Sequence, residues 1–69
     1  MREQVLWRKT ARIILRLSEK LNISSEMAMD MLYNSHTYEL FINPDSGLQL
    51  MSDEYVVNDV INEQHPRSA

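Results

Sequence analysis

The chain has 69 residues, of which 43% are apolar and 25% charged, and its ten acidic and seven basic side chains give a net charge of −3. This length allows one small domain and excludes a two-domain enzyme, and the composition is that of a globular chain rather than a disordered one. The absence of cysteine excludes disulfides and thiolate metal sites and suits a reducing cytoplasm.

Residues 3–21 have the periodicity of one amphipathic helix, with no Gly or Pro to interrupt it. At about 100° per residue, the apolar arc consists of Leu6, Trp7, Thr10, Ala11, Ile13, Ile14, Leu17 and Leu21. The opposite arc consists of Arg8, Lys9, Arg12, Arg16, Glu19 and Lys20. We expect the first arc to face the core, widened by Leu15 at its edge, and the second arc to face water.

Residues 22–26 indicate the end of this helix and the start of a second one, predicted from Ser25 to Tyr33. Ser24 is a suitable N-cap, and Glu26 places a negative charge in the first turn. The side chains expected to be buried on this helix are Met27, Ala28, Met31 and Leu32. Ser35 is expected to cap a short third helix, whose apolar side chains are Tyr38, Leu40, Phe41 and Ile42.

Residues 43–47 form the clearest turn in the sequence. Pro44 restricts its own φ angle, and Gly47 can adopt the left-handed conformation that other residues avoid. Residues 48–50, Leu-Gln-Leu, predict a short extended piece. The last helix should begin at residues 52–54 and bury Val56, Val57, Val60 and Ile61. The side chains of this helix that should face water are Asp53, Asn58, Asp59, Asn62 and Glu63.

Together these elements predict an all-α fold of three main helices plus a short fourth, with a Pro-Gly turn before the last helix. Residues 1–63 are expected to form a single small helical domain, and residues 64–69 a flexible C-terminal tail because they carry no apolar anchor. A core of this size supplies only roughly 3–5 kcal/mol of stability. We therefore expect support from a protein partner or from a second copy of the chain.

The longest apolar runs contain three residues, far too few to cross a membrane. The first residues, Met-Arg-Glu, are followed by alternating charges and not by the apolar segment of a signal peptide. The sequence therefore predicts a cytoplasmic protein without a membrane partner.

No pattern of residues predicts catalysis. His36 and His65 are the only histidines, and His65 lies in the expected tail. Ser35 and Thr37 flank His36, but adjacent residues on a helix do not face one another, so a helix cap is the simpler role for Ser35. There is no glycine-rich phosphate loop, no nucleophile elbow and no histidine pair at metal-binding spacing. We expect a non-enzymatic protein without a cofactor.

Two acidic pairs are the candidates for binding a hard cation: Asp53 with Glu54, and Asp59 with Glu63. The residue spacing of a calcium-binding loop is missing around both pairs. Solvated helix faces are the simpler interpretation, and no metal site is predicted.

The basic residues are concentrated near the start of the chain. Residues 1–22 carry six basic and two acidic groups, whereas residues 23–69 carry one basic and eight acidic groups. Arg8, Arg12 and Arg16 recur every four residues, and Lys9 and Lys20 broaden them into what we call the basic stripe.

Three hypotheses explain the basic stripe. It is a solvated face with some arginines paired to the chain's own acidic helices, a docking surface for an acidic protein, or a nucleic-acid interface. The natural recognition helix of a helix-turn-helix reader, residues 36–42, carries Glu39 and no Lys or Arg, which disfavours nucleic acid. The partner-binding residues predicted on the docking hypothesis are Trp7, Arg8, Arg12 and Arg16.

Methionine and tryptophan leave two interpretations open. Met27 and Met31 share a helix face and are most simply core residues, although flexible thioethers also suit partner surfaces. Trp7 is either a lid on the core or an anchor at an interface.

Four short patterns between residues 24 and 61 occur in a fixed order. They are Ala28-x-x-x-Leu32-Tyr33-x-Ser35, Thr37-Tyr38-x-Leu40, Gly47-Leu48-x-Leu50 and Glu54-Tyr55-Val56-Val57-x-Asp59-Val60. In this order they resemble a family of very small bacterial proteins known as domain of unknown function 3791. The amphipathic segment 3–21 fits the helix that precedes these patterns in the family.

The resemblance implies a small helical protein without catalytic residues. Genes of this family commonly lie beside genes for proteins similar to ADP-ribosyltransferases, which implies a regulatory or antitoxin-like partnership with a larger protein. The function predicted on this basis is a non-catalytic protein-interaction module. The alternatives are a small DNA-binding transcriptional regulator and a structural module that associates with itself.

Overall fold

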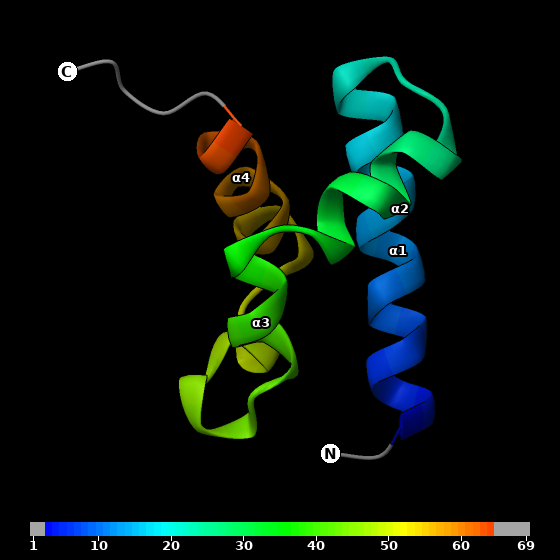
Figure 1. Cartoon of the computed structure of the whole chain (residues 1–69). Helices are drawn as coiled ribbons and strands as arrows, with labels where there is room; N and C mark the ends of the chain where they lie inside the picture. The colour runs from blue at the N-terminus through cyan, green and yellow to red at the C-terminus, as the bar shows by residue number, and fades with distance from the viewer. Residues whose placement is uncertain (1–2, 65–69) are drawn as a thin grey trace, which may run out of the picture.

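A computed structural model of the chain describes residues 3–64 (Figure 1). Its helices, in chain order, are α1 (Glu3–Leu21), α2 (Ser25–Tyr33), α3 (His36–Ile42) and α4 (Asp53–Gln64), and the single 3₁₀ turns η1 (Pro44–Ser46) and η2 (Leu48–Leu50) connect α3 to α4. These described residues include no strand. The predicted all-α fold, with its short additional helix and its Pro-Gly turn, is confirmed.

The bend between α1 and α2 is made by local hydrogen bonds. Asn22 adopts the left-handed conformation, with a φ angle of 55°, and the amide of Ile23 donates to the carbonyl oxygen of Ser18 over 3.0 Å. This arrangement is the Schellman motif that ends many helices. The hydroxyl of Ser24 then accepts the amide of Met27 over 3.1 Å, which confirms the predicted cap of α2.

The start of α3 combines a predicted cap with one that was not predicted. The hydroxyl of Ser35 accepts the amide of Tyr38 over 3.0 Å, as expected. The carboxylate of Glu63 accepts the amides of His36 and Thr37 over 2.8 and 2.6 Å, and it also accepts the Thr37 hydroxyl. Glu63 was expected only to face water, but it links α4 to the first turn of α3.

These contacts also shift the ionisation of Glu63. Burial by itself would raise the pKa of Glu63, but the hydrogen bonds from Thr37 and from the amide of His36 outweigh it and lower that pKa overall. The charged form of Glu63 is therefore the one that stabilises the junction between α3 and α4.

Gly47 has a φ angle of 78°, which confirms its predicted left-handed conformation. The extended piece predicted for residues 48–50 is wrong, because these residues form η2. The amide of Leu50 donates to the carbonyl oxygen of Gly47 over 3.0 Å, and that of Met51 to Leu48 over 3.1 Å. Within residues 3–64 no strand lies alongside to pair with, so these amides are satisfied inside the turn itself.

Gly47→Val should lower the free energy of unfolding by roughly 1–2 kcal/mol, the cost of placing a side chain at a left-handed position. A Cβ atom at residue 47 would meet no other atom within 4 Å, so the loss comes from the backbone and not from a clash. Chemical denaturation would measure it. Gly47→Asn is the control, and its loss should be smaller because asparagine tolerates this conformation; equal losses would contradict the backbone explanation.

The core lies where α1 meets α2 and α4, and where α3 packs against α4 (Figure 1). Its side chains without exposed area belong to Ile13, Leu17, Ala28, Leu32, Phe41, Val56, Val57 and Val60. Ile14 and Leu48 complete it, with 6% and 8% of their area exposed. The predicted core-facing stripe of the last helix is therefore confirmed for its three valines.

Several side chains differ from the predicted burial on α1. Trp7, Ala11 and Leu15 are exposed, although all three were assigned to the apolar arc or its edge. The short length of α2 explains why Trp7 is exposed. Helix α2 has nine residues against nineteen in α1 and starts beside the C-terminal end of α1, so it does not extend along the N-terminal half, where Trp7 lies. Lys9, which was expected to face water, is instead buried.

The shorter helices also bury less than predicted. Met27 on α2 is 58% exposed, so its assignment as a core residue is wrong. Leu40 and Ile42 on α3 are exposed as well. The buried residues of α2 are Ala28 and Leu32, and those of α3 are Thr37 and Phe41, because each of these short helices turns one narrow face toward its neighbours.

The boundary predicted after residue 63 falls inside α4, which continues through Gln64. Residues 65–69 of the predicted tail, including His65, lie outside the described residues. Of the helices between residues 3 and 64, none has both the length and the apolar character to cross a membrane.

Candidate protein interface on the first helix

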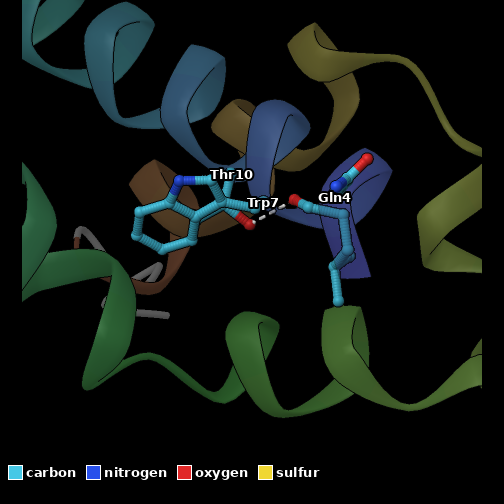
Figure 2. A pocket seen from close by; sticks show the side chains of 4 residues that line it. Gln4, Trp7 and Thr10 are labelled. Carbon is cyan, nitrogen blue, oxygen red and sulfur yellow. Dashed lines mark hydrogen bonds between the residues drawn. The ribbon is translucent and has the colours of Figure 1, made fainter. Parts of the chain in front are cut away.

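Trp7 is the most prominent feature of the N-terminal half of α1. Its side chain is 63% exposed and borders a pocket of about 400 Å³, whose described lining residues also include Gln4, Leu6 and Thr10. Figure 2 shows the indole ring of Trp7 extending out from α1. The helical repeat explains this grouping, since Leu6 and Thr10 are four residues apart, and Gln4 and Trp7 are three apart.

The pocket offers few polar groups to a ligand. The hydroxyl of Thr10 donates to the carbonyl oxygen of Leu6 over 2.8 Å, the bond drawn as a dashed line in Figure 2. Leu6 and the indole ring of Trp7 provide apolar surface beside it. A pocket of this kind suits an apolar side chain of a protein better than a small polar molecule, which needs several convergent polar groups.

All of the basic stripe except Arg8 pairs with the start of α4. Lys9 Nζ is 2.9 Å from Asp53 Oδ1 and donates to the carbonyl oxygen of Met51 over 2.7 Å. Arg12 Nε is 2.8 Å from Asp53 Oδ2. Asp53 therefore accepts two cations, and its side chain is only 17% exposed, although it was expected to face water.

Glu54 forms the more exposed half of this contact. Arg16 Nη1 lies 3.5 Å from Glu54 Oε1, and Lys20 pairs with the other carboxylate oxygen. Lys20 also donates to Asn58 Oδ1 over 3.2 Å. These side chains are roughly half exposed, so the pairs are screened by water and salt.

Both carboxylates are shifted toward their charged forms. The hydrogen bond from Arg12, followed by that from Lys9, lowers the pKa of Asp53 although partial burial opposes it. The hydrogen bond from Lys20 lowers the pKa of Glu54 in the same way. The same contact with Asp53 raises the pKa of Arg12. Asp53 and Glu54 are therefore charged near neutral pH.

The four predicted partner-binding residues thus divide into two groups. Trp7 and Arg8 are exposed on the N-terminal half of α1. Trp7 lines the pocket, and Arg8 is the next residue in the chain and forms no ion pair with a described carboxylate. Arg12 and Arg16 are paired with α4, as in the hypothesis of a solvated, internally paired face. Their role in docking stays a prediction.

Sequence reasoning missed the buried Lys9 and its partner Asp53. A signal was present, because Lys9 follows Leu6 by three residues and precedes Ile13 by four, which places it at the edge of the core-facing arc. The two acidic residues that open α4 were the natural partners. Their distance from Lys9 in the sequence, 44 residues for Asp53, hid the pairing.

The residues considered for catalysis have structural roles. Ser35 Oγ donates to the carbonyl oxygen of Leu32 over 2.6 Å while it caps α3, and the hydroxyl of Thr37 donates to Glu63. His36 Nδ1 is 3.6 Å from Glu39, and both side chains are exposed. Between residues 3 and 64, no three His, Cys, Asp or Glu side chains gather as a metal ion would require.

Comparisons with protein-family models, curated proteins and solved structures find no match for this chain. The resemblance of residues 24–61 to domain of unknown function 3791 stays a prediction that depends on the residue patterns alone.

Proposed function

We propose that this protein is a non-catalytic interaction module that docks onto a larger protein through the N-terminal half of α1. Trp7 is the anchor of the interface, and the pocket beside it receives an apolar side chain of the partner. Arg8 lies at the rim and attracts acidic groups. The proposal assigns no chemical reaction to the chain itself.

The observation that carries the proposal is that Trp7 is 63% exposed next to a largely apolar pocket. Burying an indole ring of this size stabilises a complex strongly, and tryptophan is among the residues most enriched at the centres of interfaces. The fold does not require a tryptophan at this position, because Trp7 is exposed and does not belong to the buried core. A partner would bury the surface that α2 is too short to reach.

A protein partner fits the charge distribution better than nucleic acid does. Four of the five basic residues between residues 3 and 64 are paired with Asp53 or Glu54, so few cations are available to phosphates. The resemblance to domain of unknown function 3791 supports a regulatory or antitoxin-like role and makes an ADP-ribosyltransferase-like protein the first partner to test.

Trp7→Ala should shorten the lifetime of the complex with the product of the neighbouring gene. An anchor of this kind contributes about 2 kcal/mol or more, which corresponds to a dissociation rate about 30-fold higher. Arg8→Glu should instead slow association, most strongly at low salt, because rim charges mainly steer the encounter. Surface plasmon resonance with the immobilised chain measures both rates.

Leu15→Ala is the matched control, since Leu15 is also exposed on α1 but does not line the pocket. Both variants should melt at the temperature of the unmodified chain. Equal dissociation rates for Trp7→Ala and Leu15→Ala would overturn the proposed interface. Binding to random duplex DNA with a steep salt dependence would favour the transcriptional-regulator alternative instead. Charge reversal of Arg12 or Arg16 is less informative, because it also breaks the contact between α1 and α4.

A further inference from the structure

A second groove lies where α2 approaches the end of α4. Its volume is about 290 Å³, and its described lining residues are Met27, Asp30, Met31, Asn34 and Gln64. We call it the methionine groove. None of its described lining residues lines the Trp7 pocket, and they lie on or next to α2 and α4 instead of α1.

The methionine groove combines two apolar methionine side chains with the carboxylate of Asp30. Met27 and Met31 are four residues apart, on one face of α2, and Met27 is 58% exposed. The side-chain amide of Asn34 donates to the carbonyl oxygen of Asp30 over 2.8 Å and to its carboxylate over 3.2 Å. These bonds hold the carboxylate at the groove while leaving most of its acceptor capacity free.

Among the described residues, α2 and the segment that follows it carry acidic side chains and no Lys or Arg. The sequence from residue 21 to residue 64 contains eight acidic residues and no Lys or Arg. Asp53 and Glu54 are neutralised by α1, but Glu26 and Asp30 on α2 form no ion pair with a described basic residue. A partner that approaches α2 therefore meets negative charge, and complementarity requires that it be basic.

We propose that the methionine groove binds a helical segment of a partner protein that carries Lys or Arg beside apolar residues on one face. Methionine side chains are flexible and polarisable, so they adapt to leucine or isoleucine side chains of varied shape. The volume of the groove, about 290 Å³, lies at the lower end of the range for small-molecule sites, and it suits one or two side chains of such a helix. A second copy of this chain is a poor occupant, because four of the five basic residues described on its α1 are already paired with its own Asp53 and Glu54.

The test uses the full chain with ¹³C-labelled methionine methyl groups and a synthetic peptide of Leu and Lys whose leucines share one helix face. Titration should shift the methyl signals of Met27 and Met31 in a saturable way. The signal of Met51, which is exposed but outside the groove, should stay in place. A peptide with Glu in place of every Lys should bind at least tenfold more weakly.

Asp30→Asn should weaken binding of the Leu-Lys peptide by about two- to fivefold, the effect of losing one partly solvated charge contact. Asp45→Asn is the matched control, since it removes the same charge from an exposed residue of η1. It should leave the affinity unchanged. Both residues are exposed, so neither substitution should alter the thermal unfolding transition.

Three results would overturn the proposal. Equal losses for Asp30→Asn and Asp45→Asn would show only general attraction between opposite charges. Shifts of Met27 that depend on protein concentration without peptide would assign the groove to a second copy. Tighter peptide binding by Arg67→Ser would assign it to the chain's own C-terminal residues. The test of the Trp7 interface is independent of these results, because Trp7→Ala changes no described residue of the methionine groove.

Discussion

Leu17→Ala should lower the free energy of unfolding by roughly 2–5 kcal/mol, the usual cost of removing a buried leucine side chain. Leu17 has no exposed area and lies on α1, the helix that contacts both α2 and α4. A chain of this size has roughly 3–5 kcal/mol of stability from its core. The variant should therefore be largely unfolded at 37 °C, which circular dichroism and urea denaturation would measure.

Leu15→Ala is the same chemical change two residues earlier on α1, where the side chain is 58% exposed. Its cost should stay within about 0.5 kcal/mol, as for most surface substitutions. The comparison tests which face of α1 is buried. Similar losses in both variants would show that the core-facing side of this helix has been assigned incorrectly.

The burial of α1 shows how far periodicity predicts a fold. The period correctly identified Ile13, Ile14 and Leu17 as core residues, because these positions repeat on one face whatever packs there. It failed for Trp7 and Lys9. The period gives the direction in which a side chain points, but not how far along the helix its neighbours extend.

Contacts between neighbouring residues could be predicted from the sequence, whereas contacts between distant residues could not. The caps Ser24 and Ser35 and the left-handed Gly47 were predicted, because each depends on a few adjacent residues. The bond from Thr37 to Glu63 was not, since it joins residues 26 positions apart. Capping by a side chain of another helix leaves no local pattern, and Glu63 looked like any exposed acid.

The candidate interface was predictable in its residues but not in its arrangement. Composition and spacing singled out Trp7 and the basic stripe, including Arg8, Arg12 and Arg16. The division of that stripe depends on where the start of α4 lies, since Asp53 and Glu54 pair with the side of α1 that faces them. Of the four predicted partner-binding residues, only Trp7 and Arg8 form no ion pair with the described part of α4.

Asp53→Asn should destabilise the fold by roughly 2–3 kcal/mol near neutral pH. Removing one partner of a fully buried ion pair costs about 3–5 kcal/mol, because the remaining charge is left without compensation. The loss here should be smaller, since the Lys9 side chain is 11% exposed and keeps its bond to the carbonyl oxygen of Met51. Urea denaturation of the two proteins measures the difference. Glu54→Gln, the same type of change at the next residue, should cost less because the Glu54 side chain is 49% exposed.

The pH dependence of this difference identifies its cause. The pKa of Asp53 is lowered in the folded state, mainly by the hydrogen bond from Arg12. A group whose pKa falls on folding stabilises the protein above its ordinary pKa, here 3.8, and loses that contribution as the pH drops through the folded value. The difference in free energy of unfolding between the unmodified chain and Asp53→Asn should therefore stay constant from about pH 7 to pH 5 and disappear as the pH falls below the ordinary pKa of Asp53. An undiminished difference in strong acid, where Asp53 is neutral, would mean that this side chain stabilises α4 by packing and not through its ion pairs with α1.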